Sequence, residues 1–82
     1  MSKDGQVTRA KRDLAAHLGI DKGAISLKSV EETDWPDASL GDAQPGQVYA
    51  QMMVFGYIIT LEAQGKSYVY HSDDATRVVR AG

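Results

Sequence analysis

The first regular feature of the chain is a stripe of apolar side chains that recurs every three or four residues. This spacing is typical of one side of an amphipathic helix. It predicts a helix over residues 6–18, with Asp4 as its N-terminal cap. Gly19 suits the left-handed residue that ends a helix, and Ile20 can fold back onto the last turn. The apolar positions of the stripe are Val7, Ala10, Leu14 and Leu18.

The pattern then changes to one that indicates an extended strand. In the segment AISLKSVEET, residues 24–33, Ile25 and Leu27 alternate and therefore share one face. Val30 falls out of phase with them, because three residues separate it from Leu27. We therefore expect a β-bulge or a twist near Ser29.

The second half of the chain is rich in valine, isoleucine and tyrosine and predicts a hairpin. We expect strands over residues 48–54 and 57–62, with a bend or bulge at Gly56 between them. Residues 66–72 form the next strand, which a two-residue turn at positions 64–65 joins to the previous one. That turn sets a register whose hydrophobic pairs lie on one face. The predicted pairs are Ala63 with Lys66, Leu61 with Tyr68, Thr60 with Val69, and Ile59 with Tyr70.

These elements predict an α+β fold in which the N-terminal helix packs on an antiparallel meander of about four strands. A turn at residues 72–75 leads to a short last strand over residues 76–80. The whole chain, residues 1–82, is expected to form one domain, with residues 1–5 flexible ahead of the helix. The edge strand could pair with a second copy, so we expect a monomer or a weak homodimer.

Composition excludes several kinds of site. The chain has no cysteine, so it has no disulfide, no thiolate nucleophile and no cysteine-ligated zinc. The net charge is -2, and residues 29–65 carry acidic side chains without a single lysine or arginine. This distribution argues against nucleic-acid binding. No motif calls for a cofactor, since the glycines are too sparse for a phosphate-binding loop.

The apolar content does not predict a membrane-spanning segment. The longest run without a charged residue, residues 43–61, is interrupted by glutamine, threonine and glycine. The N-terminus, MSKDGQVTRAKRD, lacks the apolar core of a signal peptide, although a mature domain cut from a longer precursor would look the same. The cellular location therefore stays open.

A proline-containing acidic loop, DWPDASLGDAQPGQ at residues 34–47, is the candidate functional segment. It begins where Pro36 ends the strand, since proline lacks the amide hydrogen that strand pairing needs. Rigid loops on a scaffold commonly carry recognition, so we expect a non-enzymatic protein-binding or inhibitory module. Trp35 could either cover the end of the core or anchor a partner. The candidate partner-binding residues are Trp35, Pro36, Asp37, Ser39, Leu40 and Asp42.

A small hydrolase or metal-dependent enzyme is the alternative hypothesis. It would use Asp34, Asp37, Ser39 and His71, provided that these side chains converge in one pocket. His17 could meet His71 as a second metal ligand, but both are more typical of boundary or solvated histidines. The spacing of the aspartates does not match an EF-hand calcium loop. We therefore expect no catalytic residue, no metal and no cofactor.

Three ordered motifs resemble a small-domain family of uncharacterised, often exported bacterial proteins. They are WPDASLGDAQPG at 35–46, FGYIITLEA at 55–63 and GKSYVYHSD at 65–73. The resemblance covers most of the chain. Asp42 stands where the family tends to have cysteine, Ala43 and Phe55 stand where it tends to have proline, and no thiol role carries over.

The order of helix and meander also looks like that of PepSY domains, which are associated with the regulation of secreted proteases. These resemblances imply a fold, a cell-envelope or secreted location, and a protein partner, with a protease as one candidate. They imply no reaction.

Overall fold

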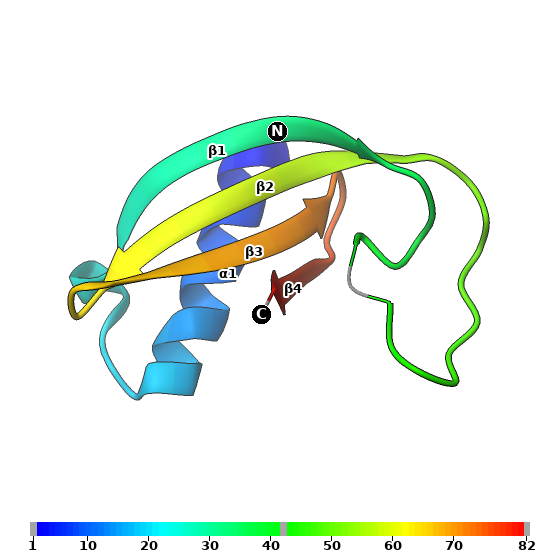
Figure 1. Cartoon of the computed structure of the whole chain (residues 1–82). Helices are drawn as coiled ribbons and strands as arrows, with labels where there is room; N and C mark the ends of the chain where they lie inside the picture. Colours follow the sequence, from blue (N-terminus) through cyan, green and yellow to red (C-terminus); the bar gives the residue numbers. More distant parts are fainter. Residues whose placement is uncertain (1, 42, 82) are drawn as a thin grey trace.

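The computed structural model describes residues 2–41 and 43–81 (Figure 1). Its architecture is one α-helix on an antiparallel four-stranded sheet with strand order β1-β2-β3-β4. This is the α+β meander that the sequence predicts. The helix lies behind the sheet in Figure 1 and packs mainly against β2 and β4. The elements are α1 (Ser2–Leu18), the 3-10 helix η1 (Lys22–Ala24), β1 (Ser26–Trp35), β2 (Val54–Ala63), β3 (Lys66–Asp73) and β4 (Val78–Ala81).

Helix α1 begins at Ser2, four residues earlier than predicted, so residues 2–5 belong to the helix and Asp4 lies in its first turn. The prediction of Asp4 as the N-terminal cap is therefore wrong. A long-range contact is made near the beginning of the helix. The side-chain nitrogen Nε2 of Gln6 donates to the Asp73 carbonyl oxygen at 2.8 Å and to the Arg77 carbonyl oxygen at 3.2 Å. This contact ties the start of the helix to the β3–β4 turn.

The C-terminal end of α1 follows the prediction. Gly19 has a φ of 69°, in the left-handed region. The Ile20 amide donates to the Ala15 carbonyl oxygen at 3.1 Å, as in a Schellman motif. Ile20 packs against the core as well, so the chain turns sharply from the helix toward β1.

The β2–β3 hairpin has the predicted register, from the Ala63–Lys66 pair to the Ile59–Tyr70 pair. Its turn residues, Gln64 and Gly65, have φ values of 55° and 76°. Two consecutive left-handed residues define the turn type whose twist matches that of a hairpin. The bulge expected near Ser29 is also present, since the β1–β2 register shifts between Leu27 and Ser29.

The core lies between α1 and the sheet, as the hydrophobic pairing predicts. Ile59, Leu61 and Tyr70 are fully buried, and Tyr68 packs against them half-buried. The helix contributes its apolar stripe, of which Ala10 and Leu14 are fully buried. Burial of this area supplies most of the favourable free energy of folding.

Three predictions about the strands differ from the structure. Residues 48–53 do not form a strand, because β1 ends at Trp35, which pairs with Val54. Pro36 follows Trp35 and cannot extend β1, so the residues before Val54 have no strand to pair with. Gly56 is not a bend or bulge, since it pairs in register with Thr33 and with Asp73. The last strand covers residues 78–81 in place of 76–80.

Candidate functional site

The long connection between β1 and β2, residues 36–53, consists of two parts that behave differently. In the first part, residues 36–41, the chain folds back on the sheet. The second part, residues 43–53, extends away from it, at the right in Figure 1. We call these parts the docked segment and the outer segment.

The Trp35 side chain covers one end of the sheet, where the docked segment begins. Its side chain is only 7% exposed, and its Nε1–H donates to the Ser72 carbonyl oxygen at 2.8 Å. Its ring lies 4.6 Å from the His71 ring, tilted by 34°. His71 pairs with Ile58, which alternates with the core residues Tyr57 and Ile59, so Trp35 and His71 lie on the sheet face opposite α1.

Leu40 completes this small second core. It is 1% exposed, and its carbonyl oxygen lies 2.7 Å from His71 Nδ1. Because a carbonyl oxygen only accepts, the proton of this bond is on Nδ1. Gly41 has a φ of 75°, and a Cβ at this position would approach Trp35 Cζ3 to 2.8 Å. The backbone therefore passes directly over the indole ring.

Asp37 and Ser39 form a local turn in the docked segment. The Asp37 carboxylate accepts hydrogen bonds from the Ser39 hydroxyl at 2.6 Å and the Ser39 amide at 2.9 Å. Both bonds hold the pKa of Asp37 below its usual value, and the bond from the Ser39 hydroxyl has the larger effect. Arg77 donates to the Ala38 carbonyl oxygen, and the Ala38 amide donates to the Ala50 carbonyl oxygen at 3.0 Å. The docked segment is thus tied to both the sheet and the outer segment.

Most of the candidate partner-binding residues are engaged in these internal contacts. Trp35, Ser39 and Leu40 are buried, Asp37 is half-buried, and Pro36 is exposed, while Asp42 lies outside the described residues. The buried side chains of this set shape the loop and present no side-chain surface to a partner.

The proposed catalytic set does not assemble in the described part of the chain. Ser39 donates to Asp37, and His71 bonds to the Leu40 backbone, but no hydrogen bond joins Ser39 to His71. Asp34 pairs with Phe55 on the helix side of the sheet, away from His71. His17 is exposed on α1, with the sheet between it and His71. Among the residues searched, no group of three acidic, histidine or cysteine side chains could hold a metal ion.

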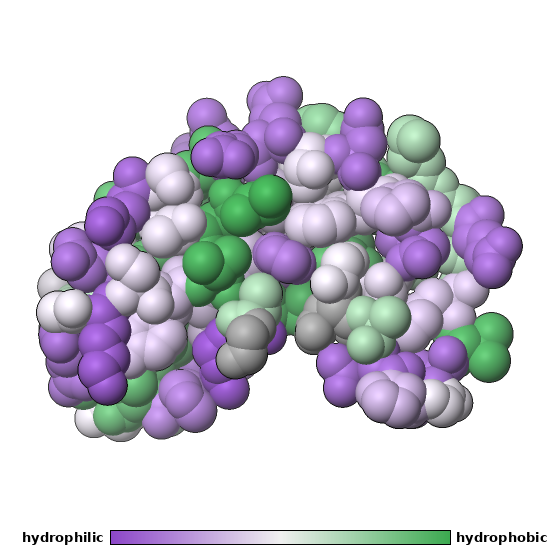
Figure 2. Space-filling model, viewed as in Figure 1, coloured by the Kyte–Doolittle hydropathy of each residue, from purple (hydrophilic) through white to green (hydrophobic). Residues whose placement is uncertain are grey.

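The outer segment holds a group of side chains that sequence reasoning missed. It carries exposed apolar side chains where residues 48–54 were expected to pair as a strand. The adjacent methionines at positions 52 and 53 break the alternation of a half-buried strand, and Pro36 removes the pairing partner; these two signals could have revealed it. Figure 2 shows apolar surface on the loop, at the right of the view, and a notch separates the loop from the left part of the molecule. The exposed fractions are 96% for Val48, 61% for Met52, 70% for Met53 and 42% for Phe55.

Helix α1 is the one α-helix in the described residues, and it is neither long nor apolar enough to cross a membrane. Comparison with curated proteins and with solved structures finds no significant match. A family model does match, over residues 7–81, which includes the helix stripe, all four strands and the loop. The chain therefore belongs to the family described as Domain of unknown function (DUF8738).

Proposed function

We propose that this domain is a non-enzymatic protein-binding module whose contact surface is the outer segment together with Phe55. The exposure of Val48, Met52 and Met53 carries the proposal. Several exposed apolar side chains on one segment of a small domain favour an interaction site, because leaving them in water costs free energy that a partner can recover. Methionine suits such a surface, since its unbranched side chain adapts to irregular partners.

The docked segment supports this function by holding the base of the loop. The Trp35–Ser72 and His71–Leu40 hydrogen bonds fix the point from which the outer segment leaves the sheet. A loop that is ordered before binding loses less conformational entropy when a partner arrives. In this proposal, Trp35 and Leu40 act as positioning residues.

Charge favours a partner with a basic rim. The hydrogen bonds from Ser39 lower the pKa of Asp37, which favours its charged form, and Asp37 lies at the base of the loop. The chain has no lysine or arginine between residues 29 and 65. A basic surface would be steered toward this side of the domain.

The resemblance to PepSY domains and to exported bacterial proteins favours an inhibitory or regulatory role toward a secreted protease. In this role, the apolar side chains of the outer segment would contact the protease surface, with the acidic loop base opposite its basic residues. A cell-envelope or secreted location is part of the same proposal.

Affinity capture with matched variants tests the function. The triple variant Val48→Ser, Met52→Ser, Met53→Ser removes apolar surface that the fold does not bury, so its melting temperature is expected to stay close to that of the wild type. The captured partner is then purified and its affinity is measured. We expect the triple variant to bind at least about tenfold more weakly.

Ala16→Ser is the control, since it removes an exposed apolar group from α1 instead of the loop. Unchanged affinity of the triple variant, or a loss of the same size in the control, would contradict the proposal.

A further inference from the structure

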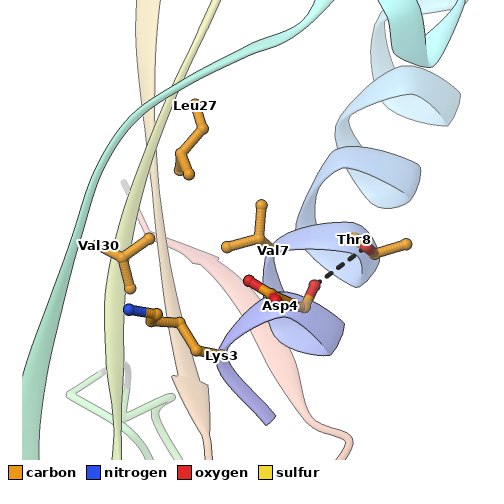
Figure 3. A pocket seen from close by; sticks show the side chains of 6 residues that line it. All are labelled: Lys3, Asp4, Val7, Thr8, Leu27 and Val30. Carbon is orange, nitrogen blue, oxygen red and sulfur yellow. Dashed lines mark hydrogen bonds between the residues drawn. The ribbon is translucent and has the colours of Figure 1, made fainter. Parts of the chain in front are cut away.

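Strand β1 is not among the strands against which α1 mainly packs. The helix packs mainly against β2 and β4, and an open groove of about 600 Å³ lies between its first turns and β1 (Figure 3). Leu27 and Val30 point from β1 into this groove, and Val7 faces them from the helix. The lining residues are Lys3, Asp4, Val7, Thr8, Leu27 and Val30.

The outer edge of β1 is also unpaired. Within the described residues, β1 pairs on one side only, with β2, along Ser26–Trp35. An edge strand presents a row of free backbone N–H and C=O groups along its outer side. A further strand placed there would continue the sheet and would direct every second side chain into the α1–β1 groove.

We propose that β1 and this groove bind an extended basic peptide segment of another protein, which adds to the sheet as an antiparallel strand. The segment carries two adjacent lysine or arginine residues followed by an aliphatic residue. This site is separate from the outer segment of the loop and does not depend on the proposed function.

The residues of β1 determine this pattern. Val30 pairs with the core residue Ile59, so a residue opposite Val30 would point into the groove and should be aliphatic. Glu31 and Glu32 follow, one on each face of the sheet, since they pair with Ile58 and Tyr57. Opposite charges in cross-strand positions stabilise a sheet, so both should meet basic residues.

Among the described residues, no ion pair involves a carboxylate of this strand. Glu31, Glu32 and Asp34 are exposed, and the ion pair found in the described part of the chain joins Arg80 to Asp13 instead. Lys28 lies at the bulge, beyond Val30, and the Lys3 side chain extends from α1 across the groove toward Val30 (Figure 3). The end of β1 nearest Trp35 is therefore acidic and favours a cationic strand.

The same charges disfavour self-association centred on the end of β1 nearest Trp35. In a symmetric antiparallel pair centred on Glu31, Glu32 or Thr33, carboxylates of the two copies would oppose or neighbour one another. Like charges in cross-strand positions destabilise pairing, and charged side chains on an edge strand commonly prevent it. In these registers, the charge pattern favours a basic peptide over a second copy.

Titration with short synthetic peptides tests this inference. The probe has a central Arg-Arg-Val sequence flanked by threonines, and binding is followed by fluorescence anisotropy and by amide chemical shifts of the labelled domain. We expect shifts concentrated at residues 27–34 and at Val7 and Thr8, with little change in the outer segment.

Charge reversal and backbone methylation supply the matched variants. Glu31→Lys with Glu32→Lys should weaken binding of the arginine peptide by about tenfold, and should strengthen binding of the matched Glu-Glu-Val peptide. Methylating the peptide amides that face β1 should abolish binding, whereas methylating those that face away should not. The Met52→Ser, Met53→Ser variant should bind the peptide as the wild type does, so the two proposals can fail separately.

Three outcomes would overturn the inference. One is the absence of shifts in β1 at millimolar peptide. Another is equal binding of both methylated peptides, which would show attraction by charge without strand pairing. The third is a dimer, detected by sedimentation, in which the β1 amides are protected from hydrogen exchange without any peptide.

Discussion

The indole nitrogen of Trp35, at the end of β1, donates a hydrogen bond to the backbone carbonyl oxygen of Ser72 in β3 across the width of β2. The bond crosses the sheet at Gly56, the β2 residue that lies between the two. A Cβ built on Gly56 would lie 1.8 Å from the Ser72 oxygen and 2.9 Å from Trp35 Nε1. The tryptophan, the glycine and the carbonyl therefore form one structural unit.

Replacement of Gly56 by alanine is expected to be strongly destabilising. The new methyl group would collide with backbone, which cannot rotate away, and the strands would have to separate. We expect a loss of about 3 kcal/mol in the free energy of unfolding, measured by urea denaturation. Gly23→Ala is the control, because its Cβ would meet only Asp21 Oδ2, at 3.6 Å. A Gly56→Ala variant as stable as this control would show that the sheet can relax here.

Trp35→Phe should separate the hydrogen bond from the ring packing. Phenylalanine keeps an aromatic ring over His71 but cannot donate to the buried Ser72 carbonyl oxygen. We expect a cost of about 1–3 kcal/mol in unfolding free energy, together with changed amide shifts at Leu40 and Gly41. Tyr49→Phe removes an exposed hydrogen bond, which the Gln44 backbone amide donates to the Tyr49 hydroxyl, and should lower the unfolding free energy by less. Equal costs for the two variants would argue against a special role of the buried bond.

The β2–β3 turn can be improved. Gln64 adopts a φ of 55°, which asparagine tolerates better than glutamine, and Gly65 already suits the second position. Gln64→Asn should raise the unfolding free energy by about 0.5 kcal/mol, whereas Gly65→Ala should lower it by about 1 kcal/mol. Thermal denaturation measures both. Destabilisation by asparagine would show that the turn differs from the left-handed pair described above.

Stability should fall at high pH because of Tyr70. Burial, and then the hydrogen bond to Asp13, raise the pKa of the Tyr70 phenol to about 12 from its usual value near 10. The folded state therefore holds its proton more tightly than the unfolded state. This contribution is complete below pH 10 and is lost as the pH rises through about 12. Urea denaturation at several alkaline pH values measures the decline.

Two variants assign that decline to Tyr70. Tyr70→Phe removes the titrating group, so the loss of stability between pH 10 and about 12 should become smaller. Asp13→Asn removes the negative charge beside the phenol and should lower the pKa of Tyr70 toward its usual value. A Tyr70→Phe variant with the same alkaline decline as the wild type would rule out this origin.

The local pattern of the sequence determined the helix, the hairpin and the bulge. The apolar stripe of α1, the Gln64–Gly65 turn and the phase break before Val30 are properties of neighbouring residues, so their outcome does not depend on distant contacts. This is why the β2–β3 register could be predicted pair by pair.

The candidate site depended on contacts between segments far apart in the chain. Whether Trp35 is buried or free is decided by Ser72, His71 and Gly56, none of which is near it in sequence. Residues 48–53 have the composition of a strand, but strand formation requires a partner, and β1 stops at Trp35.

The sequence by itself thus determined the elements and the hydrophobic face on which they meet. Only the tertiary structure decided which half of the loop is buried and which half is exposed, and that α1 leaves β1 open. The physical reason is that periodicity and turn preference act over a few residues. Burial and strand pairing depend instead on which distant segments of the chain pack against a residue in the folded structure.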